Sequence, residues 1–173
     1  MNPPITLIER FEVAAGKKIV SKLQKSPERP TVLIATADPE MRGALEGLLE
    51  ASCVNAVWVS GVKDVKTLAA SERIVACLCG FWLQDGTYRE VISHLRRERM
   101  GIPAIIVSPP SCPQEYGEYL AAMDLGALNF LSYPYQQSDF EKMLQAATAI
   151  RARAISQPQT TQTEIDFRQR GAA

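Results

Sequence analysis

The sequence has few of the side chains that most often bind transition metals: four cysteines and a single histidine. Cys77 and Cys79 are separated by one residue, which does not match the usual two-residue spacing of a zinc knuckle. Both lie in an apolar run, where a free cysteine packs like a small hydrophobic residue. His94 stands beside the basic stretch LRRERM, and we expect it to be exposed or half-packed. These residues predict no metal site and no cofactor.

The other candidates for chemistry follow short apolar runs. Asp38 comes after TVLIA and can cap a helix, because a proline follows it. Ser108 comes after AIIV and can either bond strand-end backbone groups or bind an anion or small molecule. Phe81 and Trp82 either cover the edge of the core or contact a ligand, and Asp85, before a glycine, is typical of a turn. No nucleophile–base set or glycine-rich phosphate loop is present, so we expect no enzyme.

Strands and helices alternate from Thr31 to about Arg153, and these elements must position the residues named above. Apolar runs predict five buried strands, each followed by an amphipathic helix, and we expect Ser138 to cap the last helix. This order predicts an α/β fold, a doubly wound five-stranded parallel sheet in a three-layer sandwich like that of flavodoxin. Any site then lies at the carboxyl ends of the strands. The expected strands are 31–35, 54–60, 73–80, 102–108 and 127–132, and the expected helices are 39–51, 62–71, 87–100, 114–126 and 137–153.

Three segments follow from this pattern. Residues 1–29 form an N-terminal extension, in which the spacing of Ile8, Phe11 and Ile19 is typical of an amphipathic helix. Residues 30–153 form the folded domain. Residues 154–173 are polar, and we expect a mobile C-terminal tail.

Composition limits the partners that we expect. Nineteen basic and nineteen acidic residues give a formal net charge of zero, which favours neither nucleic acid nor an anionic membrane surface. No apolar run reaches the roughly 20 residues that span a bilayer. The N-terminus lacks the charged head and apolar block of a signal peptide, so we expect a cytoplasmic protein.

Four stretches resemble response-regulator receiver domains, the family of the chemotaxis signalling regulator. They are VLIATADPEMR, CLCGFWLQDG, AIIVSPPS and LGALNFLSYPY, in the order and spacing of that family. The resemblance implies the same fold and a role in two-component phosphorelay signalling. In the family, an aspartate after the third strand accepts a phosphoryl group, and acids after the first strand hold Mg²⁺. A lysine after the fifth strand, a hydroxyl residue after the fourth and an aromatic residue on the fifth strand complete the site.

This sequence departs from that pattern at most of these positions. The acid pair falls on Thr36 and Ala37, with Asp38 one position later, and the phospho-acceptor falls on Gly80. The family's lysine falls on Tyr133, which offers bulk and one hydroxyl and could fill the space that the lost acids leave. The positions that match the family are Ser108 (hydroxyl), Phe130 (aromatic) and Pro134, whose preceding peptide bond we expect to be cis.

We therefore expect a pseudo-receiver, a non-enzymatic module that acts by protein–protein interaction without aspartyl phosphorylation. The resemblance implies an output face made of the fourth helix (113–126), fifth strand (127–132) and fifth helix (138–153), with a protein partner or a homodimer. The alternative is a small-molecule sensor that binds a ligand in an altered pocket. That pocket would be bordered by Thr36, Phe81, Ser108 and Tyr133.

Overall fold

The strands of the central sheet are parallel and form one layer through the molecule. In a computed structural model that describes residues 29–71, 73–112 and 116–156, the sheet has five strands in the order β2-β1-β3-β6-β7. This order confirms the predicted doubly wound fold. The strands are β1 (Thr31–Ala35), β2 (Asn55–Val59), β3 (Ile74–Gly80), β6 (Ala104–Val107) and β7 (Asn129–Leu131).

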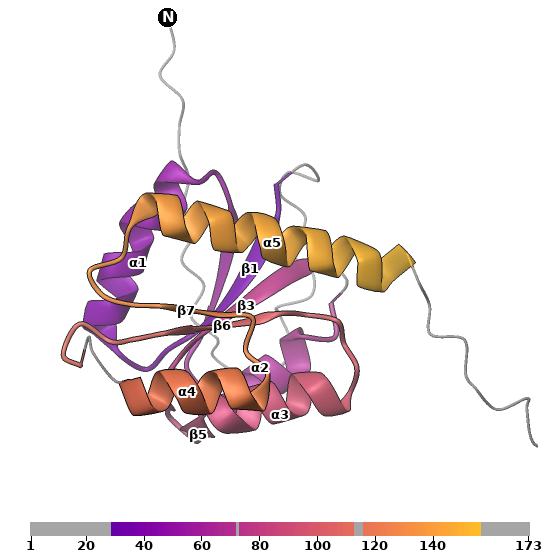
Figure 1. Cartoon of the computed structure of the whole chain (residues 1–173), viewed down its shortest axis with the longest axis horizontal. Coiled ribbons are helices and arrows are strands. Elements are labelled where there is room, and N and C mark those ends of the chain that lie inside the picture. Colours follow the sequence, from indigo (N-terminus) through magenta and orange to yellow (C-terminus); the bar gives the residue numbers. More distant parts are fainter. Residues whose placement is uncertain (1–28, 72, 113–115, 157–173) are drawn as a thin grey trace, which may run out of the picture.

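Helices cover both faces of this sheet. Figure 1 shows α1 and α5 on one face, and α2, α3 and α4 on the other. The helices are α1 (Pro39–Ala51), α2 (Val62–Leu68), α3 (Tyr88–Arg97), α4 (Tyr116–Leu125) and α5 (Gln137–Ser156). Within the described residues, no helix combines the length and the apolar character that crossing a membrane requires.

Alternation along the strands divides the core into two clusters. Leu33 and Ala35 pack on the side of α2, α3 and α4, whereas Val32 and Ile34 pack on the side of α1 and α5. This division follows because successive side chains of a strand point to opposite faces. Both clusters are closed by helices, which explains why the strands are apolar throughout rather than alternately polar.

The structure departs from the predicted elements in two places. Between β3 and α3, a short antiparallel hairpin of β4 (Trp82–Leu83) and β5 (Gly86–Thr87) replaces the predicted loop. Helix α5 begins at Gln137, so Ser138 lies inside the helix and is not its cap, and the helix continues three residues beyond the predicted boundary at 153. The predicted N-terminal helix and most of the predicted tail lie outside the described residues.

A buried arginine holds the long last helix against the sheet. Arg151 is 8% exposed, and its guanidinium donates to the backbone carbonyls of Ile74 (3.1 Å) and Met100. A guanidinium can be buried at low cost when it is satisfied by such acceptors. The contact joins the C-terminal half of α5 to the start of β3 and to the loop before β6.

Candidate functional site

The candidate site lies where the carboxyl ends of β1, β3 and β6 come together. β1 and β3 are neighbours in the sheet although β2 lies between them in sequence, so the winding direction changes there. Ligand sites of doubly wound sheets lie at such a change. Thr36, Gly80 and Ser108 occupy these strand ends. Together with Met41, they are called the strand-end site below.

After β1, Asp38 is occupied as the cap of α1. Its Oδ1 accepts hydrogen bonds from the backbone N–H groups of Glu40 (2.9 Å) and Met41 (3.4 Å), and its own N–H donates to Thr36 Oγ1 (3.0 Å). This confirms the predicted cap, which satisfies otherwise unpaired N–H groups in the first helical turn. Thr36 is buried and Ala37 is exposed. The two positions that correspond to the family's acid pair therefore carry one hydroxyl and no charge.

Gly80, at the position of the family's phospho-acceptor, is covered by a methionine. A Cβ atom placed on Gly80 would lie 3.0 Å from Met41 Sδ and 3.4 Å from Thr36 Oγ1. Met41 is 1% exposed, and Thr36 Oγ1 donates to its sulfur at 3.4 Å. An unbranched thioether side chain fits irregular spaces in a core. The space over Gly80 is thus filled by Met41.

Ser108 links the end of β6 to the segment after β7. It is fully buried, its N–H donates to Leu131 O (3.0 Å), and its Oγ accepts from the N–H of Tyr133 (2.8 Å). Its carbonyl accepts from the Tyr135 hydroxyl (2.6 Å). Of the two interpretations of Ser108 offered by the sequence, these bonds favour the backbone-bonding one.

Tyr133 does not fill the space over Gly80, so that expectation was wrong. Its side chain is 39% exposed, and its ring packs edge-on against Tyr135 with centroids 5.3 Å apart. The physical reason is that Met41 already occupies the space beside Gly80. The peptide bond between Tyr133 and Pro134 is cis, as predicted.

An aromatic row runs from the hairpin to α4 on the other side of the sheet. It consists of Trp82, Phe81, Phe130, Tyr119 and Tyr116, with neighbouring ring centroids 5.4 to 6.1 Å apart. Such distances are typical of favourable aromatic pairs. The middle of the row is buried, whereas its two ends are 61% exposed at Trp82 and 73% exposed at Tyr116. Phe81 therefore covers the core, and Trp82 faces solvent.

The carboxylate of Glu118 fixes α4 to α3 beside this row. Glu118 of α4 accepts from the Tyr88 hydroxyl and from Arg89 Nη2, which lies 3.0 Å from its Oε2. Burial, and then the Glu118 carboxylate, raise the pKa of Tyr88 to about 12, although Arg89 acts in the opposite direction. Tyr88 therefore stays a neutral donor at physiological pH.

Asp85 stabilises a helix and belongs to the hairpin turn, as the sequence indicated. Its carboxylate accepts from the N–H groups of Val62 and Lys63 at the start of α2, whose own cap residue, Gly61, makes no side-chain bond. Burial alone would raise the pKa of Asp85, but these backbone bonds and the Lys63 charge outweigh it and lower the pKa.

The two cysteines of β3 and the histidine of α3 are packed within the fold. Cys77 and Cys79 are fully buried, and burial raises the pKa of Cys77 to about 12. His94 is half-buried on α3, as expected. In the parts of the chain that the structure describes, no three His, Cys, Asp or Glu side chains are grouped so that they could hold a metal ion.

Sequence reasoning missed Met41 and Tyr135. Met41 lies in the helix that the sequence predicts over 39–51, but the sequence does not show that its sulfur reaches the end of β3. Tyr135 lies one residue beyond the proline turn, and its hydroxyl reaches Ser108 O. Burial, and then the charges of Asp38 and Tyr133, raise the pKa of Tyr135. The sequence signal for this contact was a tyrosine directly after the proline turn, whose hydroxyl can donate to a backbone carbonyl.

Comparison with known proteins identifies the fold. The sequence matches no protein-family model and no curated protein. The structure resembles the receiver domain of a Francisella response regulator, with a TM-score of 0.59 and 14% identity over 70% of this chain and 98% of that one. A response regulator receiver protein from Pseudomonas putida gives a TM-score of 0.57 and 24% identity over 68% of this chain and 97% of that one.

A third solved structure shows what the corresponding site can hold in another protein. The receiver domain of a sensor histidine kinase from Pseudomonas aeruginosa PAO1 has a magnesium ion coordinated in its active site cleft. It matches with a TM-score of 0.60 and 16% identity, over 70% of this chain and 98% of that one. The chain therefore has the fold of response-regulator receiver domains.

Proposed function

We propose that this chain is a pseudo-receiver, a signalling module that binds a protein partner without being phosphorylated on aspartate. The observation that carries the proposal is Gly80 lying under Met41 at the end of β3. A receiver needs a carboxylate at this position to accept a phosphoryl group, and glycine offers none. The Met41 side chain also occupies the space that such a group would enter.

The chemistry around Gly80 supports the same conclusion. Mg²⁺ prefers oxygen ligands in near-octahedral geometry, usually including carboxylates. Asp38, the remaining carboxylate after β1, has its Oδ1 engaged by two N–H groups of α1. Ser108 uses its hydroxyl oxygen to accept from Tyr133 N–H. The strand-end site is therefore built for packing and not for holding a divalent ion.

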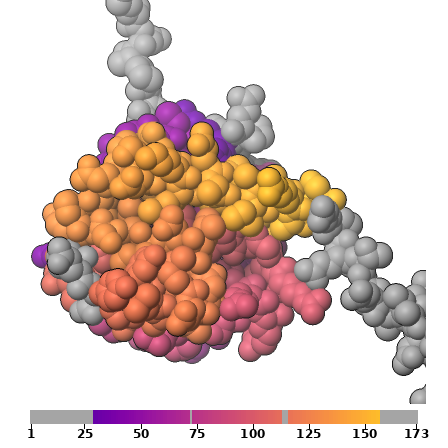
Figure 2. All heavy atoms as spheres, in the orientation of Figure 1, coloured from indigo at the N-terminus to yellow at the C-terminus, as the bar shows by residue number. Residues whose placement is uncertain are grey.

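The surface that we propose for partner binding is formed by α4, β7 and α5. α4 and α5 cover opposite faces of the sheet, and β7 is its edge strand (Figure 1). Figures 1 and 2 show that α4 and α5 meet the surface at this edge, with β7 between them. Tyr116, Tyr119 and Leu120 of α4 are 73%, 38% and 45% exposed. Exposed aromatic residues of this kind are common anchors in protein interfaces. A second copy of the chain or another protein could use these anchors.

The position of α4 supports a module that is permanently competent to bind. Glu118 is tied to Tyr88 and Arg89 of α3, and Tyr119 packs edge-on against Phe130 at 5.6 Å. A receiver that responds to phosphate shifts between two forms. Here these contacts would hold α4 in one form, so partner binding needs no chemical signal at the strand-end site.

The small-molecule alternative gains no support from the same residues. Thr36, Phe81 and Ser108 are 8%, 3% and 0% exposed, so three of its four proposed walls are covered by protein. Tyr133, the fourth, points to a partly exposed surface beside Tyr135. Partner binding is therefore the better-supported function.

The proposal can be tested by comparing two exposed aromatic residues. Tyr116→Lys places a charge on the proposed face, and Trp82→Lys places the same charge at the other end of the aromatic row. Affinity purification with quantitative mass spectrometry should recover a partner with wild type and with Trp82→Lys, but several-fold less with Tyr116→Lys. Sedimentation of the purified proteins identifies a second copy as the partner if only Tyr116→Lys dissociates a dimer.

Two results would contradict the proposed face. One is equal recovery of every partner by wild type and Tyr116→Lys, together with equal sedimentation. The other is loss of the partner by Trp82→Lys alone. Circular dichroism of both variants provides the folding control, because substitutions at such exposed positions usually change stability by less than about 0.5 kcal/mol.

A further inference from the structure

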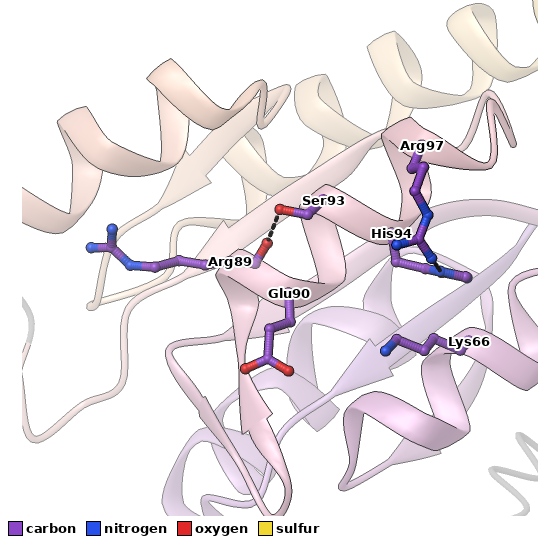
Figure 3. Close-up of a pocket in the computed structure, with 6 residues that line it drawn as sticks. All are labelled: Lys66, Arg89, Glu90, Ser93, His94 and Arg97. Carbon is purple, nitrogen blue, oxygen red and sulfur yellow. Dashed lines mark hydrogen bonds between the residues drawn. The ribbon is translucent and has the colours of Figure 1, made fainter.

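A second candidate site lies between α2 and α3, away from the strand-end site. A cleft of about 260 Å³ is lined by side chains of these two helices. Figure 3 shows His94 and Arg97 on α3 above Lys66 of α2, whose ammonium extends towards the side of the cleft where Glu90 lies. The lining residues are Lys66, Arg89, Glu90, Ser93, His94 and Arg97.

Of the four charged residues that line this cleft, three are basic and one is acidic. Lys66 is exposed and forms no ion pair with any residue in the described part of the chain. Arg97 uses its Nε to contact Glu98 (2.9 Å), which leaves its terminal N–H groups mostly free. Arg89 points away from the cleft towards Glu118, whereas the Glu90 carboxylate lines the cleft on the side of Gly86 of the hairpin (Figure 3). Two cationic groups, Lys66 of α2 and Arg97 of α3, therefore line the cleft from different helices.

His94 lies between these cations in its neutral form. Arg97 Nη2 is 3.5 Å from His94 Nδ1, and a guanidinium can only donate, so Nδ1 is the unprotonated nitrogen. The proton is then on Nε2, which is buried and has no hydrogen-bond partner among the described residues. Burial, and then the charges of Lys66 and Arg97, lower the pKa of His94, although Glu98 acts in the opposite direction.

We propose that this cleft binds a small phosphorylated anion, held by the Lys66 ammonium and the Arg97 guanidinium. Lysine supplies a point charge and arginine supplies directed N–H donors, a combination suited to phosphate oxygens. The volume of about 260 Å³ is below the roughly 300–1,000 Å³ of pockets for drug-sized ligands. The ligand class is therefore inorganic phosphate or a small phosphomonoester. The proposal is independent of partner binding at α4.

The only histidine of the chain provides a direct reporter. NMR signals of the His94 ring are followed while inorganic phosphate, or separately adenosine monophosphate, replaces chloride at constant ionic strength. We expect a saturable shift and a higher His94 pKa at saturation, because a bound anion offsets the effect of Lys66 and Arg97. Tighter binding of the monophosphate would assign the ligand as a phosphomonoester, and equal binding would assign phosphate itself.

Variants separate a built site from general electrostatics. Lys66→Gln and Arg97→Gln should each weaken binding by about tenfold, the loss expected for one charge-assisted contact. Lys142→Gln, an exposed change on α5 of the same type, should leave binding unchanged. A linear shift without saturation, or equal binding by all three variants, would overturn the proposal. Lys66 and Arg97 are exposed, so we expect both variants to fold and the His94 NMR signals to remain measurable in them.

Discussion

The strand-end site and the aromatic row are both next to the central sheet, but different interactions stabilise them. At the strand-end site, Gly80, Met41 and Thr36 are packed together without any charge. At the aromatic row, rings extend from the core to the surface, and the Glu118 carboxylate ties α4 to α3. The comparison shows that a receiver fold can have an uncharged strand-end site while α4 is tied to its neighbours by a carboxylate.

The physical reason lies in how the two regions are stabilised. Clustered carboxylates repel one another and require a compensating cation or metal ion, so a strand-end site without carboxylates needs no lysine. Tyr133 at that position makes its contacts through Ser108 and Tyr135 instead. The aromatic row depends on packing with no such compensation, so it can be retained independently. The following predictions test this separation, from the largest expected effect to the smallest.

Restoring a carboxylate at the strand-end site should have the largest effect. Gly80→Asp would place a Cβ atom 3.0 Å from Met41 Sδ and bury an acid beside an apolar side chain. We expect the free energy of unfolding to fall by about 3 kcal/mol in urea denaturation. Gly43→Asp, on an open part of α1 with nothing within 4 Å, is the matched control and should change stability little.

A further substitution shows whether Met41 causes that loss. Met41→Ala removes the contacting sulfur, so the double variant with Gly80→Asp should lose less than the two single variants combined. Additive losses, or a Gly80→Asp variant as stable as wild type, would mean that the space over Gly80 is not filled as described.

Removing the Ser108 hydroxyl should have an intermediate effect. Ser108→Ala removes a fully buried hydroxyl and leaves the N–H of Tyr133 without its acceptor, and we expect a loss of about 2 kcal/mol in the free energy of unfolding. Ser132→Ala, at a neighbouring exposed position, is the control. Unchanged stability together with altered ligand binding would instead favour the interpretation of Ser108 as a binding residue.

Loosening α4 should have the smallest effect. Tyr88→Phe removes one donor to Glu118, which keeps Arg89 as a partner, so we expect a loss of about 1 kcal/mol near neutral pH. The pKa of Tyr88 is raised in the folded state from 10.0 to about 12, so this stabilisation is complete below pH 10 and lost as pH rises towards 12. The difference between variant and wild type should therefore shrink over that range. A difference independent of pH there would contradict this account of α4.

Much of the scaffold could be predicted because its signals are local. The strand at TVLIA, the cap at Asp38 and the helix over 39–51 all appear in the structure as expected. The doubly wound parallel sheet could be predicted because apolar strands that alternate with helices have few ways to pack.

The contacts within the site could not be predicted because they join distant segments. Met41 meets Gly80 across 39 positions of sequence only once α1 has packed on the sheet. The buried Arg151 finds its acceptors at Ile74 and Met100 for the same reason, although an arginine near the end of a helix is usually exposed. The hairpin at Trp82 was missed because two-residue strands leave no periodic pattern.

Incubation with acetyl phosphate and Mg²⁺, followed by intact-protein mass spectrometry, tests the central claim most directly. With Gly80 at the end of β3 and Asp38 occupied as a helix cap, we predict that the mass of the wild-type protein stays unchanged. An increase by one phosphoryl group, mapped to any aspartate including Asp38 or Asp85, would contradict the account.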